Sequence, residues 1–309
     1  MQPASQLASE AMALIESLAN PALTVGLSFA VIYAKLESGE RSDVLPWSQR
    51  VIELADGDPS KGNFIVGSPL ALAFTTRAMA RYFLGRPGWR DDLQQGLAMA
   101  HSADPMSHAR VVSFAYWPGI PGGVLAADDR VVRESEDALR IADRSGDDLA
   151  LAFARMTLGL ALVHRPTAAE RDRGQKLLTV VSEAFARRGH NLCDLPIANV
   201  YLARERARRG DRDEAIPLMR AAVDHLVGEG RLLGWGVCAT GVLVETLLDR
   251  GADGDVAEAE AAIERLAAAP VDEGLVIREI WLAPRQRGLP RRVAAATNTR
   301  RRPQRSARQ

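Results

Sequence analysis

Apolar residues recur along this chain at helical spacing, and short polar segments containing glycine or proline separate the recurrences. Between positions 44 and 55, Val44, Leu45, Val51, Ile52 and Ala55 fall on one face of a helix. Alternating runs rich in Val, Ile and Thr, which would indicate strands, are nearly absent. The pattern therefore predicts an all-α protein in which each helix buries one face.

The predicted helices end at clear signals such as Asn20-Pro21, Ser68-Pro69 and Gly146-Asp147. They span residues 5–19, 22–37, 43–55, 69–84, 89–101, 106–117, 127–144, 148–164, 168–187, 195–209, 212–228, 232–249, 255–268 and 273–282. Most of the intervening segments are short, as antiparallel helix pairs require.

One turn occurs twice with the same helix behind it. Gly39–Pro46 and Gly210–Pro217 align without a gap, and Gly88–Leu93 is a looser third copy. Glycine readily ends a helix in the left-handed conformation, the acidic residues that follow can cap the next helix, and proline is tolerated in a first turn. Repetition of this unit predicts a TPR-like superhelix of antiparallel helix pairs over residues 1–283.

An aromatic cluster breaks into a segment rich in proline and glycine at Phe114–Gly123. Three interpretations stay open. The segment is a seam between two halves of the array, near 118–126, or a surface that faces a ligand, or a set of aromatic side chains that fills a gap between helix pairs.

Charge divides the 309-residue chain into two unequal parts. Residues 285–309 contain nine arginines and no acidic residue, whereas residues 1–284 carry a net charge of −9. A segment of this composition cannot bury a core, so we expect 284–309 to be a disordered arginine-rich tail. One interpretation is an anchor for a polyanion, through Arg300, Arg301 and Arg302. The other, which we favour, is that the tail is the product of a frameshift in a GC-rich gene.

Residues with catalytic or metal-binding potential do not form a recognisable constellation. The five histidines lack metal-ligand spacing, serine occurs without a nucleophile-elbow pattern, and the loop at 56–63 lacks the spacing of a phosphate-binding loop. We therefore expect no enzyme activity, no cofactor and no metal. Two cysteines without a disulfide framework, no signal core and no run of 18 apolar residues predict a cytoplasmic protein without a membrane span.

A helical-repeat array usually binds its partner along the concave face, which one helix of each pair lines. Polar and aromatic residues on the predicted helices are the candidates for that face: Tyr33, Arg77, Tyr82, Arg155 and Tyr201. A protein or peptide partner is expected there, and nucleic acid is not.

Long stretches of the chain resemble one group of proteins. Residues 21–30, 58–64, 68–73 and 210–215 are similar to the C-terminal helical region of large mycobacterial-type multidomain proteins. Those proteins combine a class III adenylate/guanylate cyclase domain, a P-loop ATPase domain and a TPR-like array, and some relatives end in a LuxR-type DNA-binding helix-turn-helix. The resemblance covers about residues 1–282.

The resemblance implies a regulatory or scaffolding region of a cyclase/ATPase signalling protein, with cyclase and ATPase domains as partners in cis or in trans. This chain has neither recognisable cyclase metal aspartates, nor a Walker A lysine, nor a C-terminal helix-turn-helix. The catalytic activities are therefore not carried over, and we expect a non-catalytic region that is a gene fragment. The alternatives are a nucleotide-binding, cyclase-type protein or transcriptional regulator by family membership, and nucleic-acid binding through the basic tail.

Overall fold

The computed structural model describes residues 4–64, 67–101, 103–188, 195–269, 275–276 and 278–279, and within these ranges it contains helices and no strands. The all-α prediction is therefore confirmed. In chain order the helices are α1 Ala4–Ser17, α2 Pro21–Ser38, α3 Arg41–Ala55, α4 Pro69–Phe83, α5 Trp89–Ala100, α6 Pro105–Tyr116, α7 Asp129–Ser145, α8 Asp148–Val163, α9 Ala168–Arg188, α10 Leu195–Arg208, α11 Arg212–Gly228, the π-helical turn η1 Leu232–Gly236, α12 Val237–Arg250 and α13 Asp255–Ala268. Most of the predicted helix at 273–282 and the whole tail at 284–309 lie outside the described residues.

Helix starts follow local capping chemistry. The Asn20 side chain accepts hydrogen bonds from the amides of Ala22 and Leu23, and Pro21 occupies the first position of α2. Ser68 and Asp104 cap α4 and α6 in the same way, each again followed by proline. A polar cap satisfies otherwise unpaired amides, and proline needs no partner at that position. These starts therefore lie within one residue of their predicted positions.

The repeated turn has the same hydrogen bonds in both copies. The amides of Gly39, Glu40 and Arg41 donate to the carbonyls of Leu36, Lys35 and Gly39. The amides of Gly210, Asp211 and Arg212 donate to the carbonyls of Ala207, Arg206 and Gly210. Both glycines have positive φ, 88° and 110°, as this way of ending a helix requires.

The third copy differs from the prediction. Gly85, and not Gly88, ends the preceding helix, because its amide and that of Arg86 make the corresponding bonds to Tyr82 and Arg81. Gly88 instead directly precedes α5.

Two further details of the turn are corrected. Pro46 and Pro217 lie inside α3 and α11, at the sixth residue of each, and not in the first turn. Neither Glu40 nor Asp211 caps a helix with its side chain. Glu40 instead accepts a hydrogen bond from the Lys35 ammonium at 2.6 Å, so the acidic residue ties the turn to the preceding helix.

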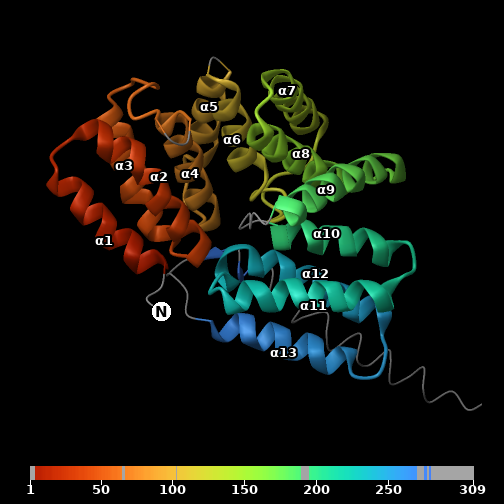
Figure 1. The fold of residues 1–309 in the computed structure, drawn as a ribbon. Coiled ribbons are helices and arrows are strands. Elements are labelled where there is room, and N and C mark those ends of the chain that lie inside the picture. Colours follow the sequence, from red (N-terminus) through yellow and green to blue (C-terminus); the bar gives the residue numbers. More distant parts are fainter. Residues whose placement is uncertain are drawn as a thin grey trace, which may run out of the picture.

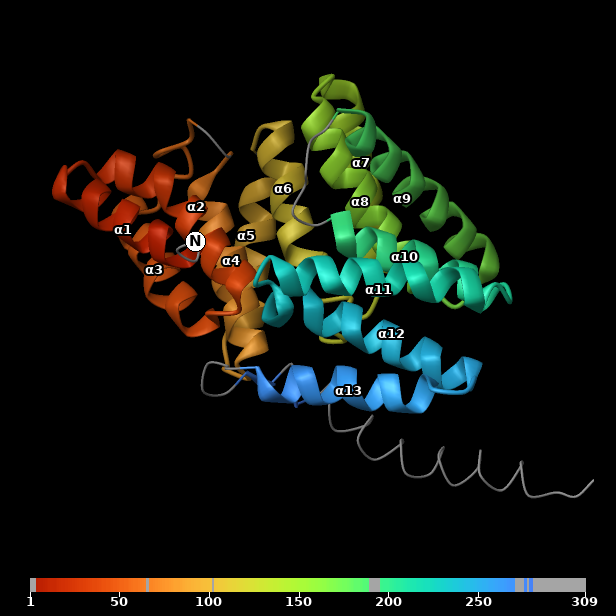
Figure 2. The same ribbon diagram turned by 60° about the horizontal axis from the view of Figure 1, so that its bottom comes forward.

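The even-numbered helices form a continuous row. α2, α4, α6, α8, α10 and α12 contact one another in series, and the odd-numbered helices pack against the outside of this row. α1 to α8 stand in an arc, and α10 to α13 lie across one end of that arc (Figure 1). The turned view shows α11, α12 and α13 side by side (Figure 2).

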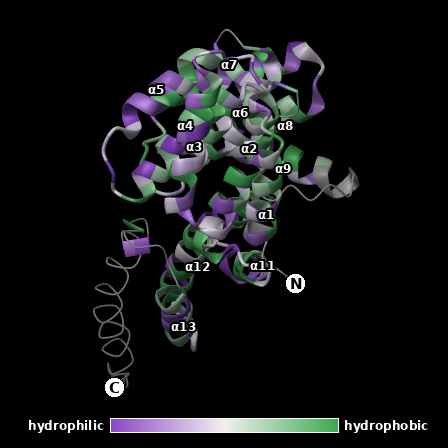
Figure 3. Ribbon diagram, turned by 90° about the vertical axis from the view of Figure 1, so that its left-hand side faces the viewer, coloured by the Kyte–Doolittle hydropathy of each residue, from purple (hydrophilic) through white to green (hydrophobic). Residues whose placement is uncertain are grey.

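Helices such as α3 and α7 have a buried apolar stripe and a polar outer face, whereas α4 is buried over most of its surface. Hydrophobic and hydrophilic colours alternate along the helices when the ribbon is coloured by hydropathy (Figure 3). The stripe predicted behind the repeated turn is buried in α11, where Ala215, Ile216 and Val223 have no exposed surface. Glycine allows the closest approach between neighbours: a Cβ at Gly174 of α9 would lie 2.8 Å from the Gly159 carbonyl oxygen of α8.

The segment after α6 fills the interior. Residues 117–122 are buried, and Trp117 stacks on Trp235 at 5.7 Å between ring centroids and contacts Phe153 of α8. Of the three interpretations of this segment, the structure supports the one in which aromatic side chains fill a gap between helix pairs.

The end of α2 contacts η1, although 194 positions separate the residues that join them. The Arg231 guanidinium forms a largely buried ion pair with the Glu37 carboxylate, with 2.6 Å between Nε and Oε2. The Trp235 indole N–H donates to the other carboxylate oxygen at 3.1 Å. Burial raises the pKa of Glu37, and the Arg231 and Arg41 guanidiniums oppose that shift. This contact closes the row of helices on itself.

Backbone contacts accompany the ion pair. Gly39 lies directly against Leu233, and a Cβ at Gly234 would lie 2.5 Å from the Glu37 carbonyl oxygen. Gly234, in the middle of η1, has a non-helical conformation, where the sequence predicts one continuous helix. The break places the chain of η1 against the end of α2.

One helical stretch among the described residues, Leu232–Arg250, is long and apolar enough by composition to cross a membrane. Its most apolar window is 67% buried inside the protein, and its side chains belong to the core formed with α8, α10 and α11. A core helix satisfies the same criteria of length and composition.

We predict that Gly39→Ala destabilises the protein more than Gly251→Ala does. Both glycines end helices with positive φ, so each substitution costs about 1 kcal/mol for the backbone conformation. Space around Gly251 is open, whereas the new methyl group at position 39 meets Leu233. Urea unfolding should show a further loss of at least about 1 kcal/mol for Gly39→Ala. Equal losses of stability in the two variants would contradict the close contact between the end of α2 and η1.

We also predict that Glu37→Gln lowers the free energy of unfolding by about 3 kcal/mol, because it leaves the buried Arg231 charge without its main partner. Glu258→Gln is the matched control. It removes an Arg–Glu pair with Arg220 that is also joined by two hydrogen bonds but is partly exposed, and it should cost less than about 1 kcal/mol. The double variant Glu37→Leu/Arg231→Leu should lose less than Glu37→Gln alone. A double variant at least as unstable would argue against the ion pair.

Candidate functional site

The hollows in the described part of the protein include one small cavity and two large grooves. One of about 20 Å³ lies where α2, α4 and α6 meet η1, and it has room for about one water molecule. Two open grooves of about 690 and 680 Å³ fall in the size range of ligand sites. The first groove is bounded by α9, α10 and α11, and the second lies between α5 and α7.

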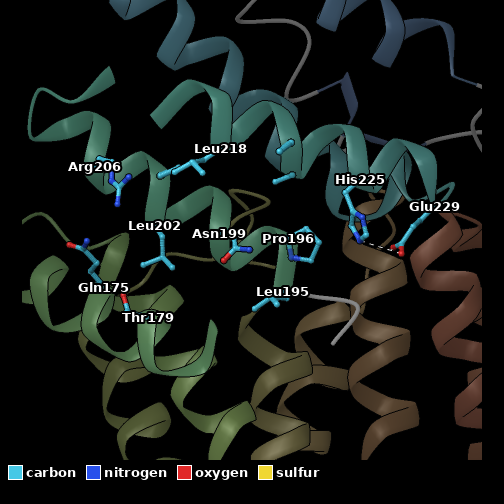
Figure 4. Close-up of a pocket in the computed structure, with 13 residues that line it drawn as sticks. Gln175, Thr179, Leu195, Pro196, Asn199, Leu202, Arg206, Leu218, His225 and Glu229 are labelled. Carbon is cyan, nitrogen blue, oxygen red and sulfur yellow. Dashed lines mark ion pairs between the residues drawn. The ribbon is translucent and has the colours of Figure 1, made fainter. Parts of the chain in front are cut away.

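The two grooves differ in their lining. Trp89 and Leu93 line the second groove together with Arg130 and Glu134, and there the Arg90 guanidinium already covers the Trp89 ring at 4.1 Å. The first groove, which we call the α10 groove, contains an uncovered apolar surface. We therefore take the α10 groove as the candidate site (Figure 4).

The floor of the α10 groove is one face of α10. Leu195, Asn199, Leu202 and Arg206 lie at helical spacing along it. The Asn199 side-chain oxygen accepts a hydrogen bond from Ser182 of α9 at 3.0 Å, which ties the floor to the neighbouring helix. The floor is therefore apolar along its length, with one amide near the middle and a cation at one end.

The walls come from the flanking helices. Gln175 and Thr179 of α9 form one wall, and Leu218, Ala221 and Ala222 of α11 form the other. Leu218 is 47% exposed, although it is a large apolar side chain. In the gapless alignment of the two turns it corresponds to Trp47, which packs against the core of the first copy. An apolar residue that has lost its cover marks this wall as a contact surface.

Charged residues mark the two ends of the groove. At one end Arg206 lies 3.6 Å from Glu214 of α11, and the equivalent pair in the first copy is Lys35 and Asp43 at 3.0 Å. At the other end His225 lies 3.2 Å from Glu229 (Figure 4). The repeat thus supplies the ion pair at the Arg206 end, and the other polar side chains of the groove are Asn199 on its floor, Gln175 and Thr179 on its α9 wall, and the pair at its far end.

The groove has the chemistry of a binding surface. Among the described residues that line it, Arg206, His225 and Glu229 are charged or titratable, and none is a serine or a cysteine that could act as a nucleophile. Within the described ranges no cluster of three or more His, Cys, Asp or Glu residues could hold a metal ion.

The five residues predicted for the concave face all lie on even-numbered helices, but the structure does not bring them together. Tyr33 of α2 is half-buried among Phe29 and Phe114, with ring centroids 6.0 and 5.9 Å away. Arg77 of α4 makes two hydrogen bonds to the buried Asp92 of α5, at 2.9 and 2.6 Å. Its guanidinium is therefore engaged with the outer helices.

The other three are placed differently. Tyr82 of α4 and Tyr201 of α10 are buried, so both are core residues and not surface contacts. Arg155 of α8 is partly exposed. The polyanion candidates Arg300, Arg301 and Arg302 lie outside the described residues.

Sequence reasoning missed the residues of the α10 groove. Leu202 and Leu218 follow ordinary helical spacing, and nothing in the pattern distinguishes an exposed leucine from a buried one. The available signal is the difference between the two copies of the repeated turn, since Leu218 replaces Trp47 directly after the conserved position of the proline.

Comparison with known proteins adds no relative. No family model matches the chain, and no curated protein sequence matches it. The resemblance to cyclase/ATPase signalling proteins therefore stays a prediction.

A partly buried histidine, His164, joins the end of α8 to α10 beside Tyr201. The His164 Nδ1–H donates to the Leu160 carbonyl at 2.7 Å, and the Arg204 guanidinium faces Nε2 at 3.4 Å. Burial, followed by the repulsion from Arg204, lowers the pKa of His164 to about 3. The ring is therefore neutral at pH 7, and it packs against Tyr201 at 4.7 Å between centroids.

This histidine predicts acid sensitivity. In the unfolded chain a histidine gains a proton near pH 6.5, whereas His164 in the folded protein does not until about pH 3. Stability is therefore lost as the pH falls below about 6.5, by about 1 kcal/mol between pH 7 and 5.5. Urea unfolding at both pH values should show a smaller loss for His164→Gln. Part of the pH dependence of stability should remain in this variant, because burial also lowers the pKa of His108. An unchanged slope in His164→Gln would contradict this assignment.

Proposed function

We propose that this chain is a non-catalytic, TPR-like helical-repeat scaffold that binds a partner protein in the α10 groove. Three features support a TPR-like architecture: the continuous inner row of even-numbered helices, the outer odd-numbered helices and the repeated turn with identical hydrogen bonds. A repeat array of this kind offers extended surfaces, so protein–protein interaction is its most direct use.

The inner face of the row is a poorer binding surface than the α10 groove. Phe29 of α2 contacts Phe114 of α6 at 5.3 Å, and Trp117 after α6 stacks on Trp235 of η1. These contacts skip one or more helices of the row, so they are made across the inside of the curve. Aromatic side chains therefore occupy the space that an open concave face would offer to a partner.

The single observation that carries the proposal is the apolar lining of the α10 groove, in which Leu218 is exposed and Leu195 and Leu202 are partly buried. A groove of about 690 Å³ between helices suits the apolar face of an amphipathic helix. The partner chemistry we propose is therefore a helical segment with apolar residues at i, i+4 and i+7.

The resemblance to cyclase/ATPase signalling proteins extends this proposal to the class of partner. If the chain is related to those proteins, the scaffold regulates or recruits cyclase and ATPase domains, in the same polypeptide or in another, and acts in the cytoplasm. Production of cyclic AMP above background by the pure protein with ATP and Mn²⁺ would replace the scaffold proposal with an enzymatic one.

A library of displayed helical peptides tests the groove. We expect the enriched peptides to share the apolar spacing given above, and Leu218→Glu to weaken their binding at least tenfold by placing a charge on the apolar wall. The matched control is Leu149→Glu on α8, an exposed leucine outside the groove. It should bind like the unaltered protein. Enriched peptides that bind Leu218→Glu as well as the control would refute the groove as the site.

A further inference from the structure

The groove between α5 and α7, which we call the α5–α7 groove, has a recessed apolar floor. Both helices pack against α6, and residues 124–126 complete the lining. Leu93 of α5 is buried, and Leu97 and Leu125 are partly buried. None of the described large apolar residues in this lining is exposed as Leu218 is in the α10 groove. A recessed apolar surface in a groove of about 680 Å³ suits a small molecule better than a protein surface.

Two exposed arginines at this groove have no partner of opposite charge among the described residues. Arg90 of α5 and Arg130 of α7 both line the groove, and neither forms an ion pair or a hydrogen bond with another described residue. Glu134 is the acidic residue in the described lining, and it already accepts the hydrogen bond of the Tyr116 hydroxyl. Burial, followed by the hydrogen bond to Glu134, raises the pKa of Tyr116, so the phenol keeps its proton and remains the donor. The unmet charge of the groove is therefore positive, and the complementary ligand group is an anion.

One of the two arginines is held in place by an aromatic ring. The Arg90 guanidinium lies over the Trp89 ring, with 4.1 Å between Cζ and the ring centroid. Stacking restrains the side chain and leaves the N–H groups in the guanidinium plane available as donors. A carboxylate can accept two parallel hydrogen bonds from such a guanidinium, because both groups are planar. Arg90 is therefore positioned to receive a carboxylate at the edge of an apolar floor.

We propose that the α5–α7 groove binds a small-molecule carboxylate with an apolar body. The apolar body lies on Leu93, Leu97 and Leu125, the carboxylate accepts hydrogen bonds from Arg90, and Arg130 supplies a second positive charge. This site shares no described lining residue with the α10 groove, so the inference goes beyond the proposed function.

A matched pair of probes tests the proposal, namely naphthoate and its uncharged analogue naphthamide, which have the same apolar body. In ligand-observed NMR titrations of the full chain, naphthoate should bind at least about tenfold more tightly than naphthamide. Arg90→Gln and Arg130→Gln should each weaken the binding of naphthoate about five- to tenfold and leave that of naphthamide unchanged. Both side chains are exposed, so neither substitution disturbs the core, and circular dichroism verifies the fold.

Three further variants show where the probe binds. Arg133→Gln removes an exposed arginine of α7 that does not line the groove, and Arg206→Gln removes the cation of the α10 groove. Both variants should bind naphthoate like the unaltered protein. Ala98→Trp fills the groove from an exposed position of α5 and should abolish the binding of both probes.

The proposal is overturned if naphthoate does not bind or binds no better than naphthamide. It is also overturned if Arg133→Gln weakens binding as much as Arg130→Gln does, or if Ala98→Trp leaves it unchanged. A loss of naphthoate binding in Arg206→Gln would place the probe in the α10 groove instead. Helical peptides should bind Arg90→Gln like the unaltered protein, so this proposal and the proposed function can fail independently.

Discussion

The contact between the end of α2 and η1 fixes the shape of this protein. Consecutive helices pack through local contacts, which would leave an open array free to flex along its length. The Glu37–Arg231 pair joins the first helix pairs to the last ones and removes that freedom. Because both charged groups are largely buried, each would be costly without the other, so the ion pair forces α2 and η1 into one relative position.

Closure accounts for the unusual features of the surrounding chain. Glycine is needed at positions 39 and 234 because the two backbones approach more closely than a Cβ would allow. The α-helical pattern breaks at Gly234, at the point where η1 meets the end of α2. The buried segment after α6 fills the space that closure encloses, with Trp117 against Trp235. These features are separate in the sequence and depend on one contact in the structure.

Local chemistry explains why the helices could be predicted and why their arrangement could not. Caps such as Asn20 and Ser68, and glycines such as Gly39, act through neighbouring residues, so their sequence pattern is enough. The third turn was misassigned because both Gly85 and Gly88 have the left-handed conformation, and only the hydrogen bonds show which one ends the helix. The ion pair across 194 positions has no local signal, because each partner is an ordinary charged residue near a helix end. The α10 groove was missed for a related reason, since exposure of Leu218 depends on how far α9 and α11 stand apart.

A closed row changes where a helical-repeat protein can bind. In an open array the concave face is free, and its residues can be selected for a ligand. Here Phe29 meets Phe114, and Trp117 meets Trp235, across the inside of the curve, so the inner surface contributes to stability instead. Binding then moves to places where the outer layer is incomplete. At the α10 groove the outer helices α9 and α11 leave one face of α10 partly uncovered, and in the proposed complex a helix from another chain would complete the layer there.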